Sequence, residues 1–207
     1  MRLAVWNNVL TFQCATLVLC FAPNAPDTLV LVYLECLEKT LGARETLSHI
    51  AQSCARTHLL RTARHESVLD FTEESCRKNG HDYVRESTIP TSAGVRRPDL
   101  IVLIGECAHV VDLTISADHV HLKRAYDAKV RYYDQPDIRH WVQLRFRCES
   151  VAFSALVYTW RGCTILETVG MLDKLGVSRY QQVIPVVRVL TDTANMFKQF
   201  TRSTTRH

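Results

Sequence analysis

The sequence lacks the features that mark fibrous, disordered and membrane-spanning proteins. Its 207 residues include only seven glycines and six prolines, with no repeat or low-complexity segment, which excludes fibrous and disordered chains. No apolar run reaches the ~20 residues that span a bilayer, so no membrane-crossing helix is expected. The eight cysteines are scattered along the chain, which favours reduced intracellular thiols over a disulfide framework. With 47% hydrophobic residues, the chain can bury one core of ordinary size.

Positive charge is concentrated in one segment. The formal net charge is only +4, but between residues 119 and 147 seven basic residues oppose three acids. The seven are Lys123, Arg124, Lys129, Arg131, Arg139, Arg145 and Arg147. Such a segment suits a phosphate backbone, and the alternative is a solvated helix face.

The N-terminal residues 1–35 are apolar and carry no recognisable chemistry. The stretch 9–22 has the general look of a secretory signal, but Gln13 interrupts it and no small-x-small cleavage site follows. A partly buried N-terminal element is the alternative. Only the secretory signal would indicate a secreted, disulfide-bearing protein.

Periodicity and breaker residues predict an α/β fold. Helices are expected over 45–54, 57–77, a segment from Ser116 or Asp118 to Tyr133, 164–175 and 180–200. Strands are expected over 81–85, 100–104, 108–115 and 151–160, with a loop at 89–97. The core order is therefore helix, strand, strand, strand, helix, strand.

Two aspartates stand at matching positions on either side of an expected turn. Asp99 precedes one apolar run and Asp112 lies in the next, with Gly105 and Glu106 between the runs. Glycine at the first position suits a two-residue hairpin loop, which places Asp99 directly opposite Asp112, about 5 Å away. Two like charges so close need protonation or a cation, and carboxylate oxygens suit Mg²⁺ or Mn²⁺. A shifted register, or acids exposed at the sheet end, is the alternative.

A lysine completes this chemistry. Lys129 lies on the helix after the second strand, one turn from Tyr126 and Tyr133. A lysine near an attacking water can orient it and offset negative charge on a phosphate. An ordinary surface lysine is the alternative.

Three segments together resemble a known family. They are 91–102 (Thr-Ser-Ala-Gly-Val-Arg-Arg-Pro-Asp-Leu-Ile-Val), 110–114 (Val-Val-Asp-Leu-Thr) and 128–134 (Ala-Lys-Val-Arg-Tyr-Tyr-Asp). They are similar to the C-terminal endonuclease of type-1 non-LTR retrotransposons of the R-two clade. Weaker similarity extends the match to roughly residues 36–200.

The resemblance implies a restriction-endonuclease-like PD-(D/E)XK core, with the αβββαβ order expected above and a mixed central sheet flanked by helices. A small Cys/His module would precede this core, and further helices would follow it. It implies that Asp99 and Asp112 are metal ligands, that Lys129 is the catalytic lysine, and that Tyr133 is the aromatic residue following it. The broader superfamily usually has a lysine two residues past the second acid, where this chain has Thr114. In the clade resembled here, the catalytic lysine lies on the following helix instead. Lys129 is therefore the natural substitute, and Lys123 is a weaker candidate for the same role.

The same resemblance implies a zinc knuckle over residues 36–58, followed by the nuclease domain over 59–207. The candidate Zn²⁺ ligands are Cys36, His49, Cys54 and His58. Thr40 and Leu41 stand where the family pattern has a cysteine, so the knuckle is either degenerate or completed by other residues. A buried Cys54 with an exposed His49 is the alternative.

These observations favour a Mg²⁺-dependent endonuclease that nicks target DNA in the nucleus, where the family's nick primes reverse transcription. DNA is the expected partner, and the element's own RNA is a second candidate. The residues expected to contact DNA are Arg96, Arg97, Lys123, Arg124 and Arg131. The alternative is an inactive nucleic-acid-binding remnant. These residues contain no Tyr-x-Asp-Asp segment, so polymerase activity is not expected of them.

Overall fold

The computed structural model describes residues 5–6, 9–10, 19–20 and 46–204. Its helices are α2 (Leu47–Gln52), the single 3-10 turn η1 (Ala55–Thr57), α3 (His58–Lys78), α4 (Leu122–Tyr133), α5 (Pro136–Phe146), α6 (Leu166–Lys174) and α7 (Val183–Thr204). The central strands are β4 (Asp82–Arg85), β7 (Leu100–Ile104), β8 (Cys107–Ser116) and β9 (Ser150–Thr159). A hairpin of β5 (Ile89–Thr91) and β6 (Gly94–Arg96) interrupts them, and β1 (Val5–Trp6), β2 (Val9–Leu10) and β3 (Leu19–Cys20) form a separate small sheet.

The four central strands form one mixed sheet in the order β4-β7-β8-β9. The first three are joined antiparallel, whereas β9 runs parallel to β8 because the chain returns through α4 and α5. The elements α3, β4, β7, β8, α4 and β9 follow the predicted core order. The antiparallel pairing of β7 with β8 was predicted from their two-residue loop, whereas the order of the four strands in the sheet was not predicted.

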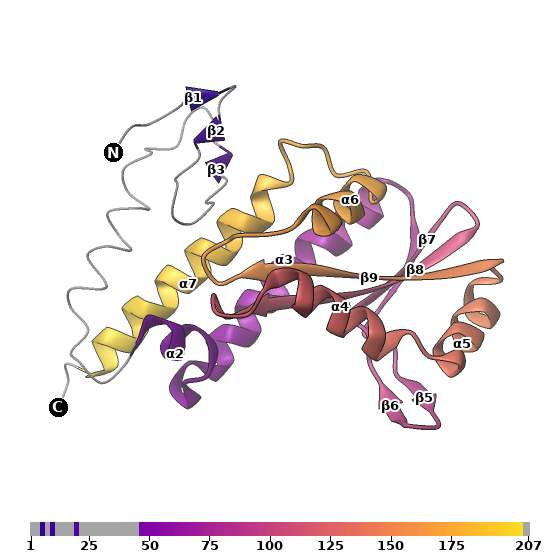
Figure 1. Ribbon diagram of the computed structural model, residues 1–207, viewed down its shortest axis with the longest axis horizontal. Coiled ribbons are helices and arrows are strands. Elements are labelled where there is room, and N and C mark those ends of the chain that lie inside the picture. The colour runs from indigo at the N-terminus through magenta and orange to yellow at the C-terminus, as the bar shows by residue number, and fades with distance from the viewer. Residues whose placement is uncertain (1–4, 7–8, 11–18, 21–45, 205–207) are drawn as a thin grey trace.

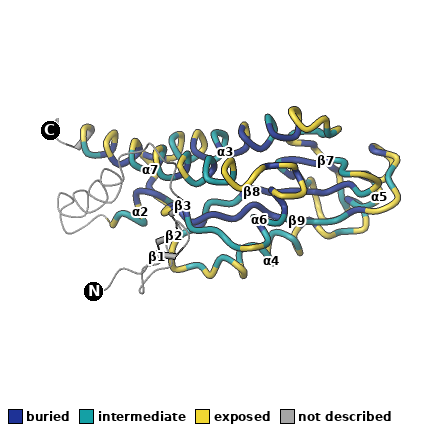
Figure 2. The backbone as a smooth tube through the Cα atoms, turned by 90° about the horizontal axis from the view of Figure 1, so that it is seen from above, coloured by how far each residue is buried: buried dark blue, intermediate teal, exposed yellow. Residues whose placement is uncertain are grey.

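Helices cover both faces of the sheet (Figures 1 and 2). On one face, α3, α6 and α7 pack against alternate strand residues such as Leu100, Val111 and Leu113. On the other face, α4 and α5 enclose a second apolar cluster that contains Ile101 and Val110. Both faces of β7 and β8 are therefore buried, which explains why their sequences read as continuous apolar runs.

Three expectations about local structure were wrong. The segment predicted as a loop at 89–97 contains the β5–β6 hairpin, which protrudes from the body of the fold (Figure 1). The helix predicted from Ser116 or Asp118 begins only at Leu122, with His121 at its N-cap, because β8 continues to Ser116. No helix was predicted over 136–146, yet Pro136 occupies the first turn of α5 there, a position where its missing N–H costs nothing.

Two other predicted ends agree with the structure. Helix α3 ends at Lys78, followed by Asn79 and by Gly80 at a φ of +72°. Gly176 after α6 has a φ of +76°, and an added Cβ would lie only 2.8 Å from Asn79 Cγ, so the ends of α3 and α6 approach closely there. Within the described part of the chain, no helix has the length and apolar character needed to cross a membrane.

Candidate active site

The β7–β8 hairpin has the register expected from its turn. Ile104 pairs with Cys107 and Leu100 pairs with Val111, with Gly105 and Glu106 forming the two-residue loop. Gly105 has a φ of +60°, a backbone conformation that glycine adopts at no steric cost. Asp99 and Asp112 follow one step beyond the last pair, at the end of the hairpin opposite the loop.

Asp112 is a buried acid surrounded by donors. Its side chain is only 4% exposed, and Lys129 Nζ from α4 lies 2.8 Å from Asp112 Oδ2. Thr114 Oγ1 donates to the same oxygen at 3.3 Å. Burial raises the pKa of Asp112 and the charge of Asp99 raises it further, while Lys129 and Tyr133 partly offset both effects. The two acids therefore interact electrostatically, as the hairpin register predicts.

Asp99 is held from the opposite helix layer. Its Oδ2 accepts a hydrogen bond from the backbone N–H of Leu113 at 2.6 Å, and His65 Nε2 from α3 lies 3.3 Å from the same oxygen. Burial alone would lower the pKa of His65, but hydrogen bonds and charge from Asp99, aided by Glu66, raise it to about 9. Asp99 thus has a cationic partner of its own in His65.

Tyr133 connects α4 to the segment that leads into β7. Its ring is buried, and its hydroxyl donates to the Arg97 carbonyl oxygen at 3.1 Å. Burial and the nearby charge of Asp112 both raise the pKa of Tyr133, so its phenol stays protonated at neutral pH. Tyr133 therefore anchors the backbone two residues before Asp99.

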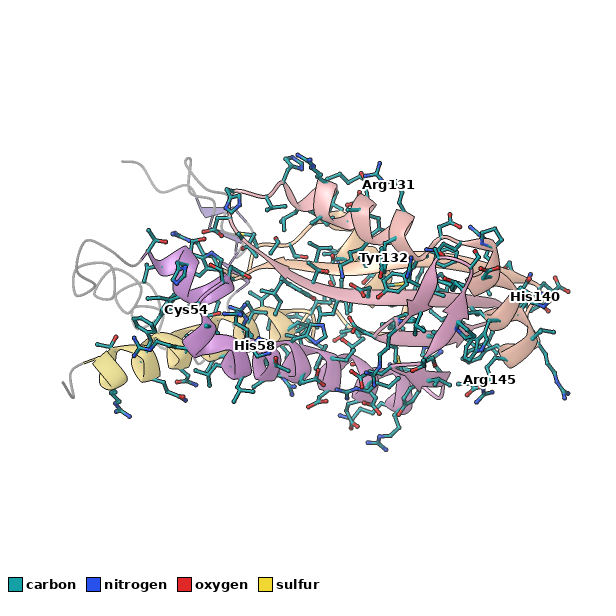
Figure 3. The ribbon with its side chains drawn as sticks, turned by 90° about the horizontal axis from the view of Figure 1, so that it is seen from below. Cys54, His58, Arg131, Tyr132, His140 and Arg145 are labelled. Carbon is teal, nitrogen blue, oxygen red and sulfur yellow. The ribbon has the colours of Figure 1, made fainter. Side chains whose placement is uncertain are left out.

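The five basic residues expected to contact DNA differ in how available they are. Lys123 is paired with Asp127 at 2.6 Å and with Glu167 at 3.3 Å, so its charge is largely neutralised. Of the other four, Arg124 and Arg131 lie on α4, Arg96 lies on β6, and Arg97 directly follows β6. Arg124 and Arg131 are exposed and have no ion pair within the described residues, Arg96 stacks on Tyr132, and Arg97 is 3.6 Å from Glu86. Figure 3 shows Arg131 and Tyr132 projecting from α4.

The predicted zinc ligands that the structure describes differ in their exposure to solvent. Cys54 is buried in an apolar cluster with Ile50 and Trp160, whereas His49 and His58 are exposed. Cys36 lies outside the described residues, and among those described no three histidine, cysteine, aspartate or glutamate side chains form a metal-holding group. The zinc site therefore stays a prediction. Among the described residues, Cys54, Cys76, Cys107 and Cys148 are free thiols.

Sequence reasoning gave two residues at this site no role of their own. His65 precedes the core residues Val68 and Leu69 by three and four positions, which places it on the same helix face. Thr114 was regarded as a departure from a family pattern, although it is a donor to Asp112. A titratable residue on an otherwise apolar helix face is the signal that could have identified His65.

Curated proteins of one kind are similar to most of this chain. The retrovirus-related Pol polyprotein from the type-2 retrotransposable element R2DM of Drosophila melanogaster is 32% identical over 160 residues, which are 76% of this chain and 15% of that protein. The Pol polyprotein from the type-1 element R2 of Popillia japonica is 33% identical over 139 residues, 66% of this chain and 29% of that protein. Most of the chain is homologous to part of an R2 retrotransposon Pol polyprotein.

A third relative extends the same match. The R2 Pol polyprotein of Nasonia vitripennis is 26% identical over 171 residues, 80% of this chain and 16% of that protein. No protein-family model matches the chain. The chain covers less than a third of the length of each of these R2 polyproteins, and their names describe the whole polyprotein. They confirm the resemblance to R-two elements and assign no activity to this segment.

Proposed function

We propose that this chain is the metal-dependent DNA endonuclease segment of an R2 Pol polyprotein, built on a PD-(D/E)XK core. The observation that carries the proposal is that Asp99 and Asp112 lie just beyond the last pair of the β7–β8 hairpin. Asp99 Oδ2 accepts from the N–H of Leu113, the residue after Asp112, at 2.6 Å, and Lys129 Nζ lies 2.8 Å from Asp112 Oδ2. A buried carboxylate beside a second carboxylate is costly, and such arrangements are typical of catalytic centres.

The donors at this hairpin fit Mg²⁺ or Mn²⁺. They are hard carboxylate oxygens. Burial of Asp112 and the nearby charge of Asp99 raise the pKa of Asp112. A site with two protein carboxylates also suits Mg²⁺, which usually keeps several waters and binds phosphate oxygens as well. Asp99 and Asp112 would hold the ion, which when bound supplies an activated water and neutralises charge on the scissile phosphate.

The protein's own groups would orient the reactants. Lys129 donates to Asp112 in the structure and is 37% exposed, so it can also donate to a water or phosphate oxygen at the same place. Tyr133 holds the Arg97 carbonyl and so keeps the backbone leading to Asp99 in position. Thr114 donates a further hydrogen bond to the Asp112 carboxylate.

DNA is the proposed substrate, with the element's RNA as a second nucleic-acid partner and the nucleus as the site of action. Arg124 and Arg131 on α4 and Arg96 and Arg97 beside the β5–β6 hairpin lie on the two elements that flank Asp99 and Asp112. Cations in this arrangement suit phosphates on either side of a cleavage point.

A nicking assay tests the proposal. The full chain is incubated with supercoiled plasmid in Mg²⁺ or Mn²⁺, and conversion to the open circle is followed. Asp99→Asn and Asp112→Asn should each abolish nicking while leaving DNA affinity unchanged or higher, because a negative charge is removed. Glu106→Gln is the matched control, since it removes an exposed acid from the loop end of the same hairpin. If the wild-type chain binds DNA and cuts in neither metal, the inactive binding remnant is the correct function.

A further inference from the structure

We infer that His65 is a positioning residue of the proposed endonuclease centre: its imidazole orients the Asp99 carboxylate and the Leu113 carbonyl toward a common point. The inference rests on the proposed function. It concerns a residue on α3, the helix layer opposite the one that carries Lys129 and Tyr133.

One ring nitrogen makes both contacts. His65 Nε2 lies 3.3 Å from Asp99 Oδ2 and 3.2 Å from the carbonyl oxygen of Leu113. Both partners are acceptors, so Nε2 carries a hydrogen. Leu113 also donates its N–H to Asp99 Oδ2 at 2.6 Å. Asp99, Leu113 and His65 therefore form a closed triangle of contacts beside Asp112.

The other side of the ring is held as well. His65 Nδ1 lies 3.4 Å from Glu66 Oε1, and Glu66 is itself bound by Arg85. Arg85 also binds Asp70 at 2.7 Å and Glu73 at 2.6 Å, which fastens β4 to α3. The imidazole is thus fixed at both nitrogens, a condition that a positioning residue must meet.

Asp99 needs such a partner because it lies outside the paired strands. Strand β7 begins at Leu100, and beyond it the Asp99 carbonyl still accepts from the Glu86 N–H at 2.9 Å, so the backbone is held there while the carboxylate needs partners of its own. Asp112, in contrast, lies within β8 and is paired with Ala155 of β9. Within residues 46–204, the Leu113 N–H and His65 Nε2 are the groups that contact the Asp99 carboxylate and set its direction.

The two helix layers contact different carboxylates. Lys129 on α4 contacts Asp112, and His65 on α3 contacts Asp99, so each carboxylate is oriented from a different face of the sheet. A shift of either helix would change how the two carboxylates that would hold the divalent cation are oriented relative to each other. Loss of such an orienting hydrogen bond typically costs 10- to 100-fold in metal affinity or activity.

The test compares two substitutions in the full chain. His65→Leu removes the Nε2 donor, and His65→Gln restores an N–H at about the same distance from the backbone. His140→Leu is the matched control, because it removes an exposed imidazole from α5. Mn²⁺ affinity is measured by isothermal titration calorimetry, nicking is measured as kcat and KM for DNA, and thermal unfolding is recorded for every variant.

We expect His65→Leu to weaken Mn²⁺ binding by about 10-fold or more and to lower kcat similarly, with KM for DNA unchanged. His65→Gln should recover most of both losses, and His140→Leu should match the wild type. Wild-type affinity and kcat in His65→Leu would overturn the inference, as would a loss that tracks lowered thermal stability and is not rescued by glutamine. If the wild-type chain neither binds Mn²⁺ nor cuts, the endonuclease proposal fails and this inference with it.

Discussion

Lys129 on α4 reaches across to β8 and places its Nζ 2.8 Å from Asp112 Oδ2. Lys123, six residues earlier on the same helix, is instead paired with Asp127 and Glu167. The two lysines are similar in sequence context, yet only one of them faces the buried acid. This difference separates a candidate catalytic lysine from a surface lysine.

Substituting these two lysines should have unequal effects. Lys129→Met should lower the nicking rate by about 10²-fold or more, because a preorganised positive charge is removed from the proposed reaction centre. Lys123→Met should leave the rate within a few-fold of wild type. Nicking time courses at saturating DNA measure both variants, and equal losses would show that Lys129 has no special role.

Tyr133→Phe should loosen the segment before Asp99. The substitution removes the hydrogen bond to the Arg97 carbonyl, so the free energy of unfolding should fall by about 1 kcal/mol and nicking should slow several-fold. Urea denaturation and the nicking assay provide the two measurements. Tyr132→Phe is the control, since the exposed Tyr132 should tolerate loss of its hydroxyl. An unchanged Tyr133→Phe protein would remove this tyrosine from the candidate site.

DNA affinity should depend on the exposed arginines of α4 more than on Lys123. In the double variant Arg124→Ala/Arg131→Ala, binding should weaken at every DNA sequence, and the slope of log K against log salt should decrease by about 2 units. Lys123→Ala should change the slope by less, because its charge is already paired. Fluorescence anisotropy at several salt concentrations measures the slopes; identical slopes in the two variants would contradict the placement of the DNA on α4.

His109 should make the fold sensitive to acid. Burial, and secondarily the charge of Lys174, lower the pKa of His109, and its Nδ1 has no hydrogen-bond partner within the described residues. The unfolded chain therefore binds a proton more readily, so His109 contributes stability above pH 6.5 that is lost as the pH falls through its lowered folded pKa. Urea midpoints from pH 7 to 4.5 should fall less steeply in His109→Leu than in wild type. Parallel curves for the two proteins would rule out this contribution.

Local patterns predicted the elements well where a strong physical rule applies. The two-residue loop at Gly105 and Glu106 predicted the hairpin register residue by residue, because side chains of an antiparallel pair alternate faces with no freedom to slip. The long helix α3 was predicted within one residue at each end from its apolar spacing and the Asn79-Gly80 stop. In contrast, Pro136 was interpreted as the end of one helix, although it begins another.

The amino-acid sequence by itself determined which residues share the β7–β8 hairpin, and hence that Asp99 and Asp112 stand side by side, because register follows from turn length alone. It also carried the homology to R2 polyproteins. Only the tertiary structure decided that His65 contacts Asp99, that Lys129 rather than Lys123 contacts Asp112, and that Cys54 is buried in an apolar cluster. These contacts join helices to strands tens of residues away. They depend on how the layers pack, and no local period or turn encodes that packing.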